Sequence, residues 1–527
     1  MKKIYLILSL VLASVMWSCT DDLDQYPVIE TDSNKVYAEA DNYKMVLAKI
    51  YASYVIAGQE QGGGNADLSS INGYDFMRSY FNLQEVGTDE IAYSWLSGNQ
   101  MSGIAFLNWD VNDPWVADTY YRCYYTIALC NELIRHCGDG EIAKFTAEEQ
   151  AEIKEYLAEA RFLRAMTYYF VLDLFRQGPF VDENTPVTGY MPEAYDGKQI
   201  FQFIESELVD DVEHALPETN EYGRASQAAA WALLAKMYLN AEVYTGESRY
   251  TDCIKYCKKI FMANKYSLEP EYAKLFNADN HKRTNEIIFS FVVDATTTVS
   301  WGATTYIICG SCGNTSTQDP AKYGLSSGWG MFRVRGELVE KFGDVASSTD
   351  SRCMFYTDGQ AQYLDKAMDD QSQGYFSEKF TNLTDEGEAA SSTQAVGCST
   401  DYPVYRLADV YLMAAEAVLR GGEGYTRSDA LGFVNDVRDR AYGDESGRIT
   451  DTQLSLDFIL DERARELLYE ATRRTDLIRY GYFTSADYIY QWKGGVVDGR
   501  AVDSKYNVYP IPASELTANT NLKNANY

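Results

Sequence analysis

A serine in a Gly-x-Ser-x-Gly pattern is the first candidate for chemistry, because many hydrolases place their nucleophile in this pattern. Gly324-Leu325-Ser326-Ser327-Gly328 matches it. The pattern works at a sharp turn between a β-strand and a helix, with a histidine base later in the chain. Here Pro320-Ala321 stand just before the match, and all three histidines precede it: His136, His214 and His281. We therefore interpret the match as a coincidence.

Closely spaced carboxylates are a second candidate, because a carboxylate pair is the usual machinery of a glycoside hydrolase. Three glutamates recur every four residues: Glu462, Glu466 and Glu470. Catalytic pairs, however, face each other across a substrate and usually come from different elements. Asp461 precedes Arg465 by four residues, and Glu470 precedes Arg473 by three, which are ion-pair spacings on one helix. This pattern favours a structural ion-pair ladder.

The ten cysteines offer metal or redox chemistry. Cys309 and Cys312 form a Cys-x-x-Cys pair, but a structural zinc site needs four ligands, and neither a second pair nor a nearby histidine accompanies them. Two other groups repeat at helical spacing, which favours small buried core residues: Cys123, Cys130 and Cys137, and Cys253 and Cys257. We predict no metal site and no cofactor.

Aromatic side chains beside polar ones form the better candidate site. Tyr93-Ser94-Trp95 and Asn99 lie on one short segment, and Tyr306 and Trp329 stand among Gly, Ser and Thr. A tyrosine or tryptophan ring stacks on the apolar C–H face of a neutral sugar, while amides and hydroxyls bind its rim. The combination indicates a glycan-binding surface. By composition alone, rings packed in a core or under a loop fit equally well.

The elements that position these side chains are mainly helices. Thr146-Ala147-Glu148-Glu149 is a capping box that opens a long helix, and Gly178-Pro179 ends it. Alanine-rich residues 223–244 and a helix from about Tyr250 to Met262 predict a helical hairpin of tetratricopeptide size. Residues 406–440 repeat this arrangement around Gly421-Gly422. Hairpins at 225–264 and 406–440 predict a mainly α, tetratricopeptide-like stacked scaffold.

Residues 294–395 separate the two hairpins and lack helical periodicity. They are rich in Gly, Ser, Thr and aromatic residues. A compact fold rarely holds so long a stretch without structure, so we expect short strands and long functional loops there. Residues 68–113 are also aromatic and poorly periodic, and we expect loops. Residues 35–527 form a single predicted domain with a loop-rich ligand face.

Charge restricts the class of partner. Asp and Glu number 77 against 46 Lys and Arg, so the net charge is −31. A surface this acidic repels nucleic acid and anionic lipid headgroups, which excludes nucleic-acid binding and favours neutral or cationic partners. Hydrophobic residues make up 46% of the chain and aromatic residues 14%, enough for a large buried core.

The first residues indicate export. Lys2 and Lys3 precede an apolar run from Ile4 to Trp17, which is too short to span a bilayer and is typical of a secretory signal. Ser18-Cys19 follows, where a lipoprotein signal peptidase would cut and leave Cys19 acylated. We predict a lipoprotein signal peptide at 1–18 and a lipid-anchored tether at 19–34. The alternative is an ordinary signal peptide beside an incidental cysteine.

Several motifs together resemble the SusD/RagB glycan-binding lipoproteins of Bacteroidetes over essentially the whole mature chain. They include Ala158-Glu159-Ala160-Arg161-Phe162-Leu163-Arg164, Arg406-Leu407-Ala408-Asp409-Val410-Tyr411-Leu412, Glu462-Arg463-Ala464-Arg465-Glu466-Leu467 and Tyr509-Pro510-Ile511-Pro512. Ala471 and Lys523 depart from the family pattern, where Gly and Gln are common. The resemblance implies a helical scaffold without catalysis, held at the cell surface on the outer membrane and docked on a SusC-like TonB-dependent transporter.

Within the family, the chain is most similar to its starch-binding member. The resemblance implies that starch or malto-oligosaccharide lies on an arc of rings from Trp95, Tyr306 and Trp329. Tyr93 would lie alongside, with Arg78 and Asn99 on the hydroxyls. Such an arc suits the curved helix of an α-glucan better than flat cellulose. The alternatives are another glycan in the same role, a surface glycoside hydrolase, or a scaffold whose hairpins bind peptide.

Overall fold

The computed structural model describes residues 33–60, 65–68, 74–313, 318–391 and 397–527. Cys19, the predicted signal peptide at 1–18 and nearly all of the predicted tether lie outside these residues. Within the described ranges, no helix combines the length and apolar character that a membrane crossing requires.

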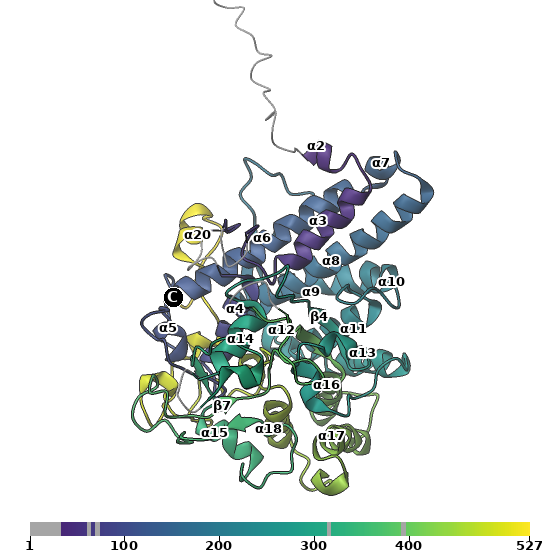
Figure 1. The fold of residues 1–527 in the computed structure, drawn as a ribbon. Coiled ribbons are helices and arrows are strands. Elements are labelled where there is room, and N and C mark those ends of the chain that lie inside the picture. The colour runs from purple at the N-terminus through teal and green to yellow at the C-terminus, as the bar shows by residue number, and fades with distance from the viewer. Residues whose placement is uncertain (1–32, 61–64, 69–73, 314–317, 392–396) are drawn as a thin grey trace, which may run out of the picture.

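Three long helices from the N-terminal third pack against one another at the top of Figure 1: α3 (Asp41–Ala52), α6 (Pro114–His136) and α8 (Ala147–Phe175). The predicted capping box of α8 is confirmed. The Glu149 N–H donates to the Thr146 hydroxyl at 3.3 Å, and the Thr146 N–H donates to the Glu149 carboxylate at 2.8 Å. The helix ends at Phe175, and the next residue, Arg176, has a φ of 57° that turns the chain before Gly178.

Both predicted hairpin regions are helical. The first contains α11 (Gln227–Leu239), α12 (Ala241–Thr245) and α13 (Tyr250–Met262), and the second contains α16 (Leu407–Leu419) and α17 (Arg427–Tyr442). α11 packs against α13, and α13 packs in turn against α16, so the two hairpins stack although about 140 residues separate them (Figure 1). The prediction of a mainly α, tetratricopeptide-like fold is confirmed.

The remaining helices are shorter. The α-helices are α2 (Ser33–Val36), α4 (Phe76–Phe81), α5 (Ser102–Ala105), α7 (Asp139–Ile142), α9 (Gly197–Ser206), α10 (Glu213–Ala215), α14 (Ala303–Ser311), α15 (Gly336–Val339), α18 (Leu456–Glu466), α19 (Arg473–Arg479) and α20 (Ala513–Ala518). Two π-helical segments are η3 (Asn82–Val86) and η4 (Glu207–Val212). The 3₁₀ turns are η5 (Tyr272–Phe276), η6 (Asn280–Lys282), η7 (Pro320–Tyr323), η8 (Glu340–Phe342), η9 (Glu445–Gly447), η10 (Lys493–Gly495) and η11 (Ser504–Asn507).

The strands of the described residues form four antiparallel pairs. These are β1 (Ala92–Tyr93) with β5 (Phe332–Arg333), β2 (Gln177–Pro179) with β3 (Ala194–Asp196), β4 (Ile287–Phe291) with β8 (Tyr402–Arg406), and β6 (Phe355–Tyr356) with β7 (Phe376–Ser377). The short strands β5, β6 and β7 lie in residues 294–395, where they are expected. Because β1 pairs with β5, the aromatic segment near residue 93 joins this insert.

Several helices occupy segments that the sequence predicts as loops, and the longest of them are α4 and α14. All six residues of α4 and all nine residues of α14 are buried. A helix that is buried on every side has no polar stripe, and therefore its sequence shows no amphipathic period. The loop predictions for these segments are wrong for this reason.

The predicted ion-pair ladder around Glu466 is also wrong. α18 ends at Glu466, so Glu470 lies outside the helix. Arg406, at the end of β8, donates to Glu466 at 2.6 Å and to Glu470 at 2.7 Å. Asp461 pairs with Lys341 rather than with Arg465. We call the buried set the charge cluster: Glu286, Arg352, Lys379, Arg406, Arg440, Glu462, Glu466 and Glu470.

Candidate functional site

The β1–β5 ladder brings the two best candidate tryptophans to one place. Tyr93 pairs with Phe332, and the Ser94 N–H then donates to the Met331 carbonyl at 2.9 Å. Trp95 follows the last residue of β1 by two positions, and Trp329 precedes the first residue of β5 by three. Antiparallel pairing therefore places both indoles at the same end of the ladder, although they are far apart in sequence. Trp95 is 43% exposed, and Trp329 is half-buried.

A third indole, absent from the predicted set, lies beside Trp329. Trp301 is 44% exposed, and its ring centroid is 6.1 Å from that of Trp329, with 42° between the ring planes. It stands between Ser300 and Gly302, immediately before α14. This small-residue setting is the signal that also marked Trp329. We call Trp95, Trp301 and Trp329 the indole rim.

Arg78 lies under the rim rather than on its surface. The side chain is 3% exposed, with its guanidinium carbon 3.4 Å from the Tyr74 ring centroid and 4.0 Å from that of Tyr306. Its Nη1 donates to the Trp301 carbonyl at 2.5 Å. Arg78 therefore binds protein groups in this structure, and it fixes the backbone that carries Trp301.

Tyr306, Tyr93 and Asn99 form a buried hydrogen-bond network below the rim. The Asn99 amide donates to the Tyr93 hydroxyl at 2.6 Å, which lies 3.1 Å from the Tyr306 hydroxyl. The Tyr306 hydroxyl lies 2.8 Å from the Asn82 side-chain amide oxygen, to which it donates. Burial raises the pKa of both tyrosines, so these hydroxyls stay protonated hydrogen-bonding groups.

The six predicted residues are thus brought together, but in two layers. Trp95 and Trp329 belong to the rim, and four residues lie beneath it: Arg78, Tyr93, Asn99 and Tyr306. The expected arc through Tyr306 is not formed, because α14 is enclosed and the Tyr306 ring is 0% exposed. Trp301 presents the exposed ring from the same segment. It was missed because periodicity and spacing do not reveal which of two neighbouring rings faces solvent.

The candidates for chemistry that the sequence analysis set aside lie in the following settings. The Gly-x-Ser-x-Gly segment follows the 3₁₀ turn η7 rather than a strand, so the geometry of a nucleophile elbow is not present. Cys123, Cys130, Cys137, Cys253 and Cys257 are buried, as their helical spacing predicts. In the ranges that the structure describes, no three His, Cys, Asp or Glu side chains gather as a metal site would require.

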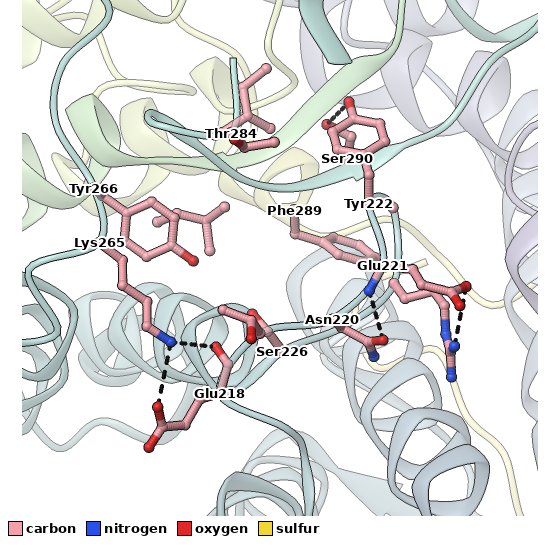
Figure 2. A pocket seen from close by; sticks show the side chains of 15 residues that line it. Glu218, Asn220, Glu221, Tyr222, Ser226, Lys265, Tyr266, Thr284, Phe289 and Ser290 are labelled. Carbon is pink, nitrogen blue, oxygen red and sulfur yellow. Dashed lines mark hydrogen bonds and ion pairs between the residues drawn. The ribbon is translucent and has the colours of Figure 1, made fainter. Parts of the chain in front are cut away.

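A separate pocket of about 460 Å³ opens between residues 218–226, residues 265–266 and strand β4. Figure 2 shows Tyr266 and Phe289 on opposite sides of the opening, with Lys265 close to Glu218. Lys265 donates to the Glu218 carbonyl at 3.0 Å and pairs with its carboxylate at 3.6 Å, so this cation is already neutralised. None of the rim residues lines the pocket, which is therefore distinct from the candidate site.

Comparisons with known proteins agree with this picture. A family model described as the SusD family matches residues 346–527. The chain is 30% identical to the starch-binding protein SusD of Bacteroides thetaiotaomicron, across 97% of this chain and 96% of that protein. It is 27% identical to SusD-like protein P25 of Formosa agariphila, across 80% and 81% of the two chains.

Solved structures show the same fold. Surface glycan-binding protein A of Bacteroides thetaiotaomicron, in complex with laminarihexaose, aligns with a TM-score of 0.71 at 20% identity, over 92% of this chain and 99% of that one. Surface glycan-binding protein A of Bacteroides fluxus aligns with a TM-score of 0.70 at 20% identity, over 93% and 100%. Since the 30% identity to SusD extends along nearly all of both chains, this chain belongs to the SusD family, whose members are non-catalytic glycan-binding proteins.

Proposed function

We propose that this chain binds starch or malto-oligosaccharides at the cell surface and delivers them to a SusC-like TonB-dependent transporter. In this proposal, acylated Cys19 anchors the protein to the outer membrane. The observation that carries the proposal is the indole rim: Trp95 and Trp301 are both nearly half exposed, Trp301 lies beside Trp329, and the β1–β5 ladder brings the Trp95 segment to the same end. The 30% identical relative is itself named a starch-binding protein.

The rim suits a curved neutral chain. The 42° between the Trp301 and Trp329 planes lets successive sugar faces stack while the chain bends, which a flat ribbon cannot do. Backbone groups hold the rim in place: the Trp329 N–H donates to the Cys309 carbonyl at 2.7 Å, and the Trp301 carbonyl accepts from Arg78. Because this surface is already held in place, it loses little conformational entropy when a ligand binds. More of the stacking energy therefore contributes to the affinity.

Catalysis is not needed for such a role. A binder placed beside a transporter raises the local glycan concentration, even when each contact is modest. A site of a few stacked rings on an open surface is expected to bind weakly, because ordering a flexible glycan opposes the contacts.

Affinity electrophoresis in gels containing soluble starch tests the rim. We expect Trp95→Ala and Trp301→Ala each to lose most of the retardation, because each removes an exposed stacking ring, while Trp301→Tyr retains part of it. Trp231→Ala, which removes a half-buried indole on α11, is the matched control and should migrate like the unchanged protein. Full retardation of the Trp95→Ala, Trp301→Ala double variant would remove the rim from the site.

The same gels decide between glucans. Laminarihexaose occupies a structural neighbour, so a β-1,3-glucan is the specific alternative. Starch and pullulan should retard this protein and laminarin should not. Retardation by laminarin alone would replace starch with a β-glucan while leaving the site in place.

The anchor and the transporter are tested in membrane fractions. Cys19→Ala should move the protein from the outer-membrane fraction to the soluble fraction, because the acyl chains are lost. A TonB-dependent transporter should co-purify with the unchanged protein from detergent extracts. Retention of the Cys19→Ala variant on the membrane would argue against acylation as the anchor.

A further inference from the structure

Two buried cysteines from distant parts of the chain meet beside the rim. Cys309 lies in α14, and Cys398 lies in the segment that leads to β8. The Cys398 N–H donates to the Thr305 hydroxyl at 3.0 Å, and Thr305 precedes Cys309 by one helical turn on the same face of α14. Both thiols are free in this structure, and the neighbouring Cys398 side chain raises the pKa of Cys309.

The Cys-x-x-Cys spacing points to a different partner, which the structure does not support. α14 ends at Ser311, and Cys312 takes an extended conformation after it, with φ −96° and ψ 122°. The Cys312 thiol lies 3.7 Å from the Gly313 carbonyl. The partner of Cys309 is therefore Cys398, 89 residues away, rather than the cysteine three residues along.

We propose that Cys309 and Cys398 form a disulfide when the protein is exported to an oxidising compartment. The oxidant is a disulfide of the thiol–disulfide oxidoreductase class. One cysteine thiolate attacks that disulfide, forms a mixed disulfide and releases one thiolate of the oxidant. The second cysteine thiolate then attacks the mixed disulfide, which closes the Cys309–Cys398 bond and releases the other oxidant thiolate. Two protons leave the cysteines, and two electrons reduce the oxidant to its dithiol.

Burial sets the order of events. Both side chains are at most 1% exposed, so a large oxidant reaches them only before α14 is covered. The contact with Cys398 and burial raise the pKa of the Cys309 thiol, and an un-ionised thiol is a poor nucleophile. The disulfide therefore forms during folding, and once buried it is shielded from reductants.

The cross-link would hold the ligand face to the scaffold. α14 begins directly after Trp301, and the segment with Cys398 continues into β8, which ends at Arg406 of the charge cluster. A neighbouring contact already joins the same two segments, since the Thr304 hydroxyl donates to the Thr400 carbonyl. A covalent bond here ties the rim to the hairpin stack across a loop of about 90 residues, where loop closure most restricts the unfolded chain.

A second contacting pair provides the matched control. Cys253 and Cys257 are also buried neighbours, one helical turn apart, but both lie in α13. A bond between them would join neighbours that the helix already holds, and it would close only a very short loop. We expect this pair to stay reduced.

Peptide mapping of the full chain, exported to the periplasm of a disulfide-forming bacterial host, tests the proposal. The protein is denatured without reductant, alkylated with iodoacetamide and digested. We expect a Cys309–Cys398 linked peptide, and alkylation of Cys253 and Cys257. Dithiothreitol during thermal unfolding should lower the Tm by several degrees. The Cys309→Ser, Cys398→Ser double variant should lose this Tm dependence, and Cys253→Ser, Cys257→Ser should keep it.

Alkylation of both Cys309 and Cys398 without reductant, or a linkage to another cysteine, would overturn the proposal. This readout requires only the unchanged protein, so a variant that fails to fold does not affect it. The proposal rests on export of the chain but not on its ligand. Linked peptide without starch retardation contradicts only the proposed glycan, and starch retardation without linked peptide contradicts only the disulfide.

Discussion

The indole rim and the charge cluster both gather side chains that could bind a ligand. They differ in how their polar contacts are made. In the rim, backbone groups make the fixing hydrogen bonds, which leaves the Trp95 and Trp301 rings exposed. In the cluster, the side chains pair with one another. Glu466 accepts from Arg352 at 3.0 Å and from Arg406 at 2.6 Å. A dense group of carboxylates is therefore not a binding or catalytic site when buried arginines already donate to its oxygens.

The pKa values of two buried glutamates show what a partner cation changes. Burial raises the pKa of Glu462, but Arg352, Arg465 and Arg438 outweigh it and lower the pKa to about 2. Burial likewise raises the pKa of Glu90, where the opposing contacts are too weak, and the pKa rises to about 7. Carboxylates paired with arginine therefore stay charged, whereas a buried carboxylate such as Glu90 keeps its proton to a higher pH than usual.

The largest effect should come from breaking the cluster. Arg406→Met leaves Glu466 and Glu470 without a shared partner in the interior, so we expect a loss of about 3–5 kcal/mol in the free energy of unfolding. Denaturant unfolding measures it. Arg427→Met is the control, because Arg427 is half exposed and pairs with exposed Asp451, and it should cost at most about 1 kcal/mol. Equal losses in the two variants would show that burial of the pair is unimportant.

A pH dependence should separate Glu90 from the cluster. Glu90 and the neighbouring Glu85 titrate as a pair: burial raises the pKa of Glu90 to about 7 and also raises that of Glu85, so their contribution is fully present below the unfolded pKa and is lost as the pH rises through about 7. Glu90→Gln should flatten this decline, which is on the order of 2 kcal/mol between about pH 5 and 8. Denaturation midpoints at both pH values measure it. Exposed Glu445→Gln should leave the decline unchanged.

The cluster should respond in the opposite direction. Because the pKa of Glu462 is lowered, its contribution is present above pH 4.5 and is lost as the pH falls toward about 2. If the stability of the Glu90→Gln variant declines with rising pH as steeply as that of the unchanged protein, the decline comes from other titratable groups.

A smaller effect should come from the support of the rim. Arg78→Lys keeps the charge but loses the planar stack between Tyr74 and Tyr306 and its directed bond to Trp301. We expect starch affinity to fall about tenfold, which is about 1.4 kcal/mol. Isothermal titration measures affinity, and thermal unfolding checks that the variant is folded. Arg448→Lys, at an exposed ion pair, is the control. Unchanged affinity would show that the rim does not depend on its buried layer.

The smallest effect should be a gain. Ala471, next to Glu470 of the cluster, has a φ of 53°, a left-handed conformation that disfavours a side chain. Ala471→Gly should stabilise the protein by about 0.5–1 kcal/mol, measured by thermal unfolding. Ala430→Gly, in helix α17, should destabilise it by a similar amount. A loss at position 471 would mean that the contacts of its methyl group outweigh the backbone strain.

Prediction from sequence succeeded where structure is local. The capping box at Thr146 and Glu149 opens α8, and α13 runs from Tyr250 to Met262, where its apolar spacing places it. Caps and amphipathic periods act within a few residues, so a single segment carries the whole signal. α4 and α14 were missed because each is enclosed, and an enclosed helix carries no period.

Partners distant in the chain were not predictable in the same way. The i to i+4 spacing assigns Asp461 to Arg465, but Lys341 lies closer in the fold. Cys309 and Cys312 are neighbours in a Cys-x-x-Cys motif, but Cys398, 89 residues away, packs against the same face of α14 as Cys309. In both cases a long-range contact replaces the neighbour in sequence.

The amino-acid sequence by itself determined the helical scaffold, the family motifs and the presence of an aromatic, polar surface suited to glycan, because residue type and local spacing carry that information. Only the tertiary structure decided that Trp301 faces solvent while Tyr306 and Arg78 lie beneath it. Exposure depends on which distant segments pack over a side chain. Here the β1–β5 pairing and the enclosure of α14 decide which side chains are buried.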